Sequence, residues 1–223
     1  MNVAIIPARG GSKRIPRKNV KNFRGKPMIA YSIRASIESG CFDKIIVSTD
    51  DDEIARVALE FGAEVPFMRP DYLSDDIVGT TSVIAHSTEW LLNQDIDVNL
   101  VCCVYATAPL IDPQDIRRGL NRISGSNFDY AFSATNYAFP IQRAFKILDD
   151  DTVEMFNPDE FQTRSQDLTN AWHDAGQFYW GTAEAWLSER PLFGRNSVPI
   201  ILPRYKVQDI DDYDDWEYAE LIF

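Results

Sequence analysis

The sequence predicts an α/β fold, a three-layer arrangement in which helices cover both faces of a mostly parallel sheet. Short, uniformly apolar segments alternate with amphipathic ones along the first half of the chain. Parallel strands buried on both faces have this apolar composition. With 45% hydrophobic and 12% aromatic residues, the 223-residue chain can bury a sizeable core. We therefore expect one domain over residues 1–223, and not a disordered chain.

The expected strands are short apolar runs bounded by turn-forming residues such as Pro7 and the Gly10-Gly11 pair. They cover residues 3–6, 44–49, 100–105, 130–135 and 198–202, with an edge strand at 64–67.

The expected helices are identified by apolar residues three or four positions apart. Asp51 is suited to cap the second helix, and Gly40 and Gly62 to end the first and second. The inner faces are predicted to be Ile29, Ile33 and Ile37; Ile54, Ala58 and Phe61; Val83, Ser87, Trp90 and Leu91; Ile116, Leu120 and Ile123; and, in a last helix, Trp216, Ala219 and Phe223.

Residues 138–178 interrupt the alternation and are rich in polar and aromatic side chains. We interpret this segment as an arm inserted into the domain, and as a candidate for substrate contact and subunit pairing. The chain then returns through the strand at 198–202 and an extended segment near 205–210.

Charge is distributed very unevenly along this acidic chain, whose net charge is −12. Residues 1–37 contain no Asp or Glu but nine basic residues, which are Arg9, Lys13, Arg14, Arg17, Lys18, Lys21, Arg24, Lys26 and Arg34. Confining cations to one segment favours a local anion site. A nucleic-acid-binding protein would carry a basic stripe or domain, so we expect no nucleic-acid partner.

Three cysteines do not make a disulfide framework, and Cys102 and Cys103 lie within an apolar run. The first residues lack a charged leader, and no segment approaches about 18 consecutive apolar residues. We expect a cytoplasmic protein that neither spans nor binds a membrane.

The loop after the first strand, Ala8 to Asn19, reads ARGGSKRIPRKN. Its glycines let backbone N–H groups approach an anion, and its Lys and Arg side chains can neutralise a triphosphate. It has neither the Walker pattern nor the G-x-G-x-x-G of dinucleotide sites. Ligands of parallel sheets bind beyond the carboxyl ends of strands, so we expect loops 9–22, 49–51 and 106–112 to meet.

Asp209 and Asp211 flank Ile210 between an extended segment and a helix. In an extended backbone, residues two apart point the same way, roughly 6.5–7 Å from one another. Two such carboxylates suit Mg²⁺, which also takes phosphate oxygens and water. The alternative is a solvated acidic helix start. Asp50 is a further candidate metal contact, or a helix N-cap.

Arg9, Ser12, Lys13, Lys18 and Asn19 fit A-R-x-x-S-K-x-x-x-x-K-N, and the pattern resembles the signature of the cytidylyltransferases that activate sialic acids. The resemblance continues through residues 25–29, 46–50 and Arg69-Pro70. It then runs through Thr107-Ala108-Pro109-Leu110, where the family has P-T-S-P-L-R.

The resemblance implies a nucleotide-diphospho-sugar transferase-like, Rossmann-like fold and transfer of CMP from CTP to a nonulosonic acid. It implies Mg²⁺ held by Asp209 and Asp211, which act in catalysis together with Arg9 and Lys18. It also implies a homodimer in which each arm reaches the neighbouring pocket. The implied nucleotide-binding residues are Arg9, Gly10, Gly11, Ser12, Lys13, Lys18, Asn19, Arg69 and Asp76.

The sialate enzymes read R-P-N-G-A-x-Y where this chain has His173-Asp174-Ala175-Gly176-Gln177-Phe178-Tyr179. This departure, with residues 140–144 and 164–167, resembles the pseudaminate-specific branch. The candidate sugar contacts are Thr107, Gln142, Arg143, Arg164, His173 and Gln177. Arg143 or Arg164 suits the sugar carboxylate, and His173 is a sugar contact, a proton-transfer group or a packing residue.

Three alternatives stay open from the residues. The same reaction would act on N-acetylneuraminate or legionaminate, the chain would be a nicotinamide-dependent oxidoreductase, or it would bind a nucleotide without catalysis. The missing G-x-G-x-x-G counts against the oxidoreductase, and the paired aspartates are unexplained by a non-catalytic binder.

Overall fold

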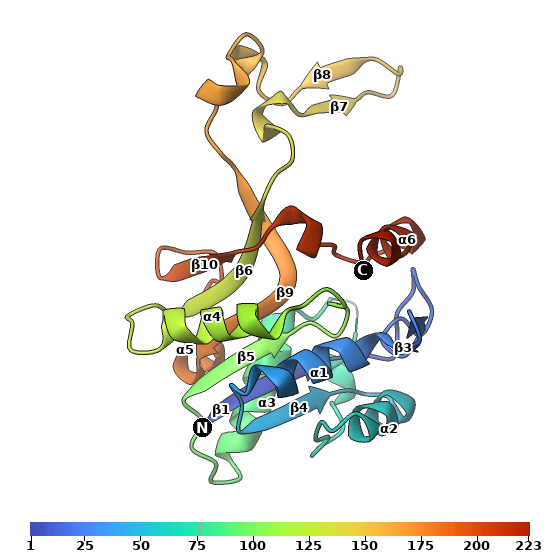
Figure 1. Cartoon of the computed structure of the whole chain (residues 1–223), viewed down its shortest axis with the longest axis vertical. Coiled ribbons are helices and arrows are strands. Elements are labelled where there is room, and N and C mark those ends of the chain that lie inside the picture. Colours follow the sequence, from blue (N-terminus) through green and yellow to red (C-terminus); the bar gives the residue numbers. More distant parts are fainter. Residues whose placement is uncertain (76) are drawn as a thin grey trace.

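A central sheet of six strands, in the order β10-β6-β9-β5-β1-β4, organises the chain (Figure 1). The computed structural model describes residues 1–75 and 77–223. The sheet strands are β1 (Asn2–Pro7), β4 (Lys44–Ser48), β5 (Leu100–Val104), β6 (Tyr130–Asn136), β9 (Trp172–Thr182) and β10 (Ser197–Ile201).

The sheet is mostly parallel, as the apolar strands predict. Strand β1 runs parallel to β4 and β5, and β10 runs parallel to β6. Only β9 is antiparallel to both of its neighbours, β5 and β6. Five of the predicted strands are confirmed within a residue or two at their ends, and β9 was not predicted.

Helices cover both faces of the sheet, which confirms the three-layer prediction (Figure 1). Alternate strand residues face opposite layers: Cys102 packs with α1, α2 and α4, whereas Cys103 packs with α3 and α5. The helices are α1 (Met28–Ser39), α2 (Asp52–Glu60), α3 (Thr80–Leu92), α4 (Pro113–Ile123), α5 (Ala183–Leu187) and α6 (Tyr213–Ile222).

Two predicted elements are wrong in detail. Residues 64–67 form no strand; Glu64 and Met68 make only isolated parallel bridges to Ile46 and Thr49. Ile37 is 47% exposed, because α1 buries Ile29 and Ile33 instead and fills its remaining inner positions with small residues such as Ala30 and Ser36.

The arm leaves the sheet after β6 and returns at β9, extending well away from the rest of the chain (Figure 1). It carries the hairpin of β7 (Phe145–Ile147) and β8 (Val153–Met155). The predicted end at residue 178 is too late, because β9 already pairs with β6 from Trp172 onward. Polar residues such as His173, Asp174 and Gln177 hide this central strand from an apolar pattern.

Two small elements complete the part that positions the site. A hairpin of β2 (Asn22–Phe23) and β3 (Lys26–Pro27) closes the basic loop before α1. Among the described residues, no helix combines the length and apolar character needed to cross a bilayer.

Candidate active site

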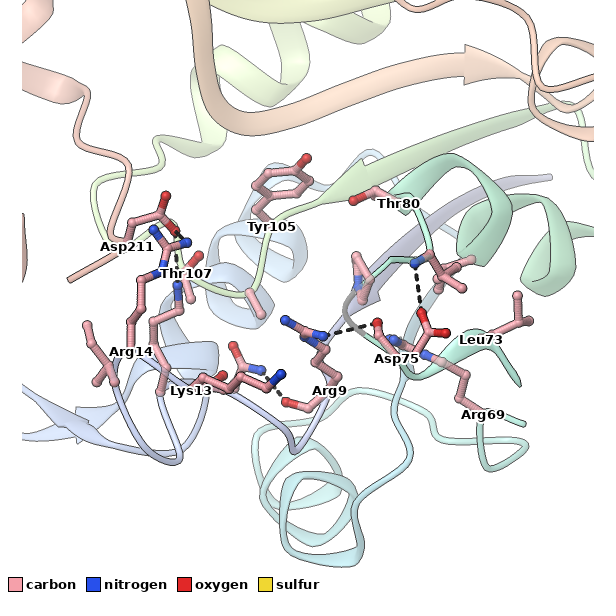
Figure 2. Close-up of a pocket in the computed structure, with 18 residues that line it drawn as sticks. Arg9, Lys13, Arg14, Arg69, Leu73, Asp75, Thr80, Tyr105, Thr107 and Asp211 are labelled. Atoms are coloured by element: carbon pink, nitrogen blue, oxygen red, sulfur yellow. Dashed lines mark hydrogen bonds and ion pairs between the residues drawn. The ribbon is translucent and has the colours of Figure 1, made fainter. Parts of the chain in front are cut away.

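A pocket of about 320 Å³ opens at the carboxyl ends of β1 and β5 (Figure 2). Asp211 and Arg14 lie at one end, and Arg69 and Asp75 lie at the other. The lining residues are Pro7, Arg9, Ser12, Lys13, Arg14, Ile15, Lys18, Asn19, Arg69, Leu73, Asp75, Val78, Thr80, Val83, Tyr105, Ala106, Thr107 and Asp211.

The glycine turn of the basic loop is fixed against the end of β4. The N–H of Gly10 donates to Asp50 Oδ1 at 2.9 Å, so this N–H is already used within the chain. A Cβ at Gly10 would lie 2.8 Å from Asp51 Oδ2, whereas one at Gly11 would meet no atom within 4 Å. The turn therefore requires glycine at position 10 because of close approach, while Gly11 lies open at its tip.

Asp50 and Asp51 have structural partners. Asp51 is the N-cap of α2, because its side chain accepts from the N–H groups of Glu53 and Ile54. Arg17, in a left-handed conformation at φ 57°, forms ion pairs with Asp51 and Glu53. These bonds hold the pKa of Asp51 down, at about 2. Arg17 thus anchors the loop and does not line the pocket.

The other cations of the loop face the pocket together with Ser12 and Asn19. Arg9 Nη1 donates to the carbonyl of Asp75 at 3.0 Å, across one side of the pocket (Figure 2). Asn19 is buried, and its side-chain amide donates to the carbonyl of Arg9 at 2.9 Å. Asn19 therefore braces the loop as well as lining the pocket.

The two ends of the chain meet at Lys18. Its Nζ donates to the carbonyl of Ile210 and lies 3.8 Å from Asp211 Oδ1. Arg14 Nη2 lies 2.7 Å from the same carboxylate oxygen. Burial lowers the pKa of Lys18, and the charges of Asp211 and Asp209 oppose that shift. The basic loop and Asp211 thus line one pocket.

A satellite hydrophobic cluster holds these two segments together. Ile15 and Phe23 from the loop region pack with Ile210 and with Trp216 of α6. The Phe23 ring meets the Trp216 ring edge-on at 5.3 Å. Ile210 is fully buried, so the carboxylates on either side of it are directed away from the core.

The alternative interpretation of the acidic run, a helix start, holds for the residues after Asp211. Asp212 and Asp215 form a capping box at the N-terminus of α6. The side chain of Asp215 also accepts from the N–H of Asp211 at 2.9 Å. Asp209 and Asp211 precede the helix, and their side chains are not part of this capping box.

The residues present fit a divalent cation that prefers oxygen ligands. Asp209 and Asp211 offer carboxylate oxygens on either side of Ile210, and burial and the charge of Asp211 raise the pKa of Asp209. Among residues 1–75 and 77–223, no group of three or more His, Cys, Asp or Glu residues gathers to hold a metal. A cation held by two carboxylates would complete its shell with phosphate oxygens and water, as Mg²⁺ does.

Arg69 occupies the opposite end of the pocket. It is 6% exposed, and its guanidinium donates to the side-chain and main-chain oxygens of Ser48. Burial lowers its pKa to about 10. Asp76, predicted to bind nucleotide, lies outside the described residues.

The structure separates the predicted sugar contacts. Thr107 lines the pocket, whereas Gln142, Arg143 and Arg164 lie on the arm and bind arm partners, namely Thr169, Thr163 and Asp167. His173 Nδ1 lies 2.8 Å from the carbonyl of Asp174, and its ring packs on Tyr137.

Gln177, a predicted sugar contact, is only 3% exposed, and its amide donates to the carbonyl of Lys206.

Five polar residues in or beside the pocket were not predicted from the sequence, which are Arg14, Asp75, Thr80, Tyr105 and Asp174. Arg14 was counted among the cations but not assigned to the site. Tyr105 is the last residue of the predicted strand 100–105, and its position at the carboxyl end of a strand was the available signal.

Residues 3–213 match the family model described as cytidylyltransferase. The chain belongs to the cytidylyltransferase family. This confirms the family predicted from the loop motif and decides against the nicotinamide-dependent oxidoreductase. This cytidylyltransferase is 46% identical to pseudaminic acid cytidylyltransferase of Campylobacter jejuni, over all of this chain and 96% of that protein.

More distant relatives extend the comparison. One is CMP-N,N'-diacetyllegionaminic acid synthase of Legionella pneumophila, 30% identical over 98% of this chain and 94% of that protein. The solved structure of a CMP:2-keto-3-deoxy-manno-octonic acid synthetase complexed with CTP has a TM-score of 0.67 and 16% identity. The match covers 99% of this chain and 97% of the synthetase chain, and it confirms the fold predicted from the resemblance.

Proposed function

We propose that this cytidylyltransferase transfers CMP from CTP to the anomeric hydroxyl of pseudaminic acid, a nonulosonic acid, and releases pyrophosphate. One observation carries the proposal. The cationic loop after β1 and the carboxylate of Asp211 line the same pocket, although they lie near opposite ends of the chain. The full-length similarity to the Campylobacter enzyme supports pseudaminic acid as the acceptor.

In this proposal the basic loop holds the triphosphate. Arg9, Ser12, Lys13 and Lys18 line the pocket together and offer donors to phosphate oxygens. Gly10 shapes the turn, and its N–H donates to Asp50. Gly11 lies at the open tip, where a phosphate can approach the backbone closely. Asn19 and Arg69, with Asp76 carried over from the resemblance, orient the nucleoside.

Asp209 and Asp211 are the proposed ligands of Mg²⁺. When bound, the ion supplies neutralisation of phosphate charge and polarisation of the α-phosphate. Arg14 and Lys18 share one oxygen of Asp211 and hold that carboxylate at the end of the pocket.

The reaction is an in-line displacement. The anomeric oxygen of the sugar forms a bond to the α-phosphorus while the bond from that phosphorus to the bridging oxygen breaks, and the hydroxyl proton passes to water. Pyrophosphate leaves with the electron pair. Positioning and charge neutralisation supply most of the catalysis in such transfers. In this proposal Lys18 stabilises charge on the triphosphate, which is supported by its place in the pocket lining and by its bond to the carbonyl between the paired aspartates.

The arm supports a homodimer. Its exposed apolar side chains include Phe139, Phe145, Ile147, Phe156 and Phe161, which are 57–82% exposed. A second pocket of about 280 Å³ lies at its base, between residues 136–140 and 165–172. We propose that arms of two copies cover these surfaces. Arg143 and Arg164, remote from their own pocket, would then serve the sugar carboxylate in the neighbouring one.

The cytoplasmic location stays a prediction. The three described cysteines are free thiols, which supports it.

The test is an assay of pyrophosphate release with Mg²⁺, four nucleoside triphosphates and a panel of pseudaminate, N-acetylneuraminate and legionaminate. We expect CTP with pseudaminate to give the highest kcat/KM. A preference for N-acetylneuraminate or legionaminate would assign the same chemistry to that sugar. CTP binding without pyrophosphate release in the presence of any of the three sugars would instead favour a non-catalytic nucleotide binder.

A further inference from the structure

Strand β9 contains a bulge beside the segment of the paired aspartates. Phe132 and Ala134 of β6 pair with Tyr179 and Asp174 of β9, so four residues of β9, 175–178, lie opposite a single residue of β6. A bulge bends its strand and redirects the side chains within it. The β9 bulge, residues 175–178, therefore presents its side chains differently from the regular parts of the strand.

Gln177 is fixed within the β9 bulge by its main chain. Its N–H donates to Ser133 Oγ of β6 at 3.3 Å, and its carbonyl accepts from the N–H of Tyr105, just after β5, at 2.9 Å. The residue is also buried. Because its backbone is bonded to both neighbouring strands, the Gln177 side chain projects from a rigid support.

The Gln177 amide holds the chain that leads into the paired aspartates. Its Nε2 donates to the carbonyl of Lys206 at 2.5 Å. A carbonyl oxygen only accepts, so the nitrogen end of the amide faces it. Lys206 ends a short 3₁₀ turn, Arg204–Lys206, and the paired aspartates lie between this turn and α6. The position of that irregular segment therefore depends on contacts such as this one.

Lys206 is bound through its side chain as well. Its Nζ lies 2.8 Å from Asp112 Oδ2 and 3.6 Å from Asp115 Oδ2. Asp112 is the N-cap of α4 and follows the loop that carries the pocket-lining residue Thr107. Residue 206 is thus joined to the β9 bulge by its carbonyl and to the start of α4 by its ammonium group.

The far end of the segment has its own contacts. The carbonyl of Ile210 accepts from Lys18, and the N–H of Asp211 donates to Asp215 Oδ2 at 2.9 Å. Gln208 Nε2 donates to Asp215 Oδ1 at 2.8 Å. These bonds fix Asp211 from the side of α6 and the basic loop. The bond to Gln177 fixes the other side, which leads into Asp209.

The β9 bulge also contacts Asp209 directly. Gly176 adopts a φ of 62°, which glycine tolerates without strain. A Cβ at Gly176 would lie 3.6 Å from the carboxyl carbon of Asp209 and 3.7 Å from its Oδ1. These are ordinary van der Waals distances, so the backbone beside Gln177 lies against this carboxylate. The bulge thus borders Asp209 and holds the chain three residues before it.

We propose that Gln177 is a positioning residue for the cation site, which places Asp209 relative to Asp211 by holding the carbonyl of Lys206. This inference rests on the proposed function, because it takes the two aspartates as ligands of Mg²⁺. Mg²⁺ demands near-ideal octahedral geometry, so a small displacement of one carboxylate weakens binding. Groups that orient the ligands of a metal without touching it commonly govern its affinity.

The test replaces Gln177 by leucine, which keeps much of the side-chain volume and removes the amide donor. Calorimetry measures CTP binding without sugar, once with Mg²⁺ and once in EDTA. We expect affinity in EDTA to stay within about twofold, while the tightening by Mg²⁺ falls from about tenfold or more to about twofold or less. Gln177→Ala removes the same donor with less bulk, and we expect the same loss.

Thr135→Val is the matched control. Thr135 is buried, and its hydroxyl donates to the carbonyl of Leu202 at 2.8 Å, so valine also removes one buried donor from the returning segment. The N–H of Leu202 keeps its own bond to the carbonyl of Ala134. We expect Thr135→Val and Gln177→Leu both to lower the melting temperature, because each leaves a carbonyl without its donor. Only Gln177→Leu should lose the Mg²⁺ effect.

Three results would overturn the inference. One is a full Mg²⁺ effect on CTP binding in both Gln177 variants. Another is an equal loss of that effect in Thr135→Val, which would indicate general loosening of the segment. The third is a raised KM for pseudaminate with an unchanged Mg²⁺ effect, which would assign Gln177 to the sugar.

Failure of the proposed function has a different signature. Absence of any Mg²⁺ effect in the unmodified chain would refute Asp209 and Asp211 as the ligands of the cation. Absence of pyrophosphate release with every acid sugar would refute the proposed reaction. Neither outcome is the same as a normal Mg²⁺ effect that persists without the Gln177 amide.

Discussion

Lys18 donates its ammonium proton to the carbonyl of Ile210, the residue between Asp209 and Asp211. This bond joins the first loop of the chain to its last extended segment across 192 residues of sequence. Ile15 and Ile210 pack in the same cluster with Trp216, so the polar contact is supported by an apolar one. The cationic and anionic parts of the site are thus held in a fixed relation before any nucleotide enters.

Replacing Lys18 by methionine keeps much of the side-chain volume and removes the charge. We expect kcat/KM for CTP to fall about 10²–10³-fold, the usual loss for a preorganised electrostatic contact. Lys44→Met is the control, because Lys44 pairs with Glu64 at the start of β4, away from the pocket. Steady-state kinetics measure both variants. Equal activity of the two would contradict the role of Lys18.

The adjacent glycines of the basic loop should differ in tolerance. An alanine at position 10 would meet Asp51 Oδ2 at 2.8 Å, and one at position 11 would meet no atom within 4 Å. We expect Gly10→Ala to lower the free energy of unfolding by about 1–3 kcal/mol. Gly11→Ala should change it by less than about 0.5 kcal/mol. Urea unfolding tests this, and similar losses in both variants would refute the described turn.

The Arg17–Asp51 pair should make stability depend on acid pH. The pKa of Asp51 is depressed to about 2 in the folded chain from 3.8, so its contribution is complete above pH 4 and lost as pH falls toward 2. The shift corresponds to about 2 kcal/mol, reduced to about 1–2 by the partial exposure of the pair.

Asp51→Asn removes the charge and keeps an N-cap side chain. We expect it to be less stable than the unmodified chain at pH 7, with about half of the difference gone by pH 3. Urea unfolding at both pH values measures this, with the exposed Asp52→Asn as the control. A difference that stays constant with pH would show that the carboxylate does not titrate as described.

The arm should control the oligomeric state. Phe145 and Phe156 are 57% and 62% exposed on its hairpin region, and aspartate at both positions would oppose burial against a second copy. We expect a dimer for the unmodified chain and a 25.4 kDa monomer for Phe145→Asp/Phe156→Asp by light scattering. Leu221→Asp is a control, because Leu221 is 80% exposed on α6. An unchanged mass would reject the arm as the interface.

Local patterns predicted much of this molecule. The apolar runs indicated five strands of the sheet, and Asp51 caps α2 as its position suggested. Strand β9 escaped prediction because its bulge and polar residues break the period of a strand. Arg17 was one cation among nine in the sequence, and only the fold shows that it anchors the loop.

The candidate site was predictable where motifs are contiguous, as in the basic loop and in Asp209-Ile210-Asp211. The contacts that join Tyr105 to Tyr179 and Asp174 depend on the antiparallel pairing of β5 with β9, which no local pattern encodes. Gln177 was predicted to contact the sugar because its amide can donate hydrogen bonds, yet the bulge buries it against Lys206. Whether an arm residue serves its own pocket or the neighbouring one likewise depends on a second copy of the chain.

The sharing of one nucleotide between Asp211 and the basic loop is tested most directly by the Mg²⁺ dependence of CTP binding, measured by calorimetry for the unmodified chain and for Asp211→Asn. If Asp211 and the basic loop hold one nucleotide through a shared cation, Mg²⁺ should tighten CTP binding about tenfold or more in the unmodified chain and far less in the variant. Asp214→Asn, an exposed change in the same acidic run, should behave like the unmodified chain. An identical Mg²⁺ effect in Asp211→Asn would show that Asp211 does not hold the cation.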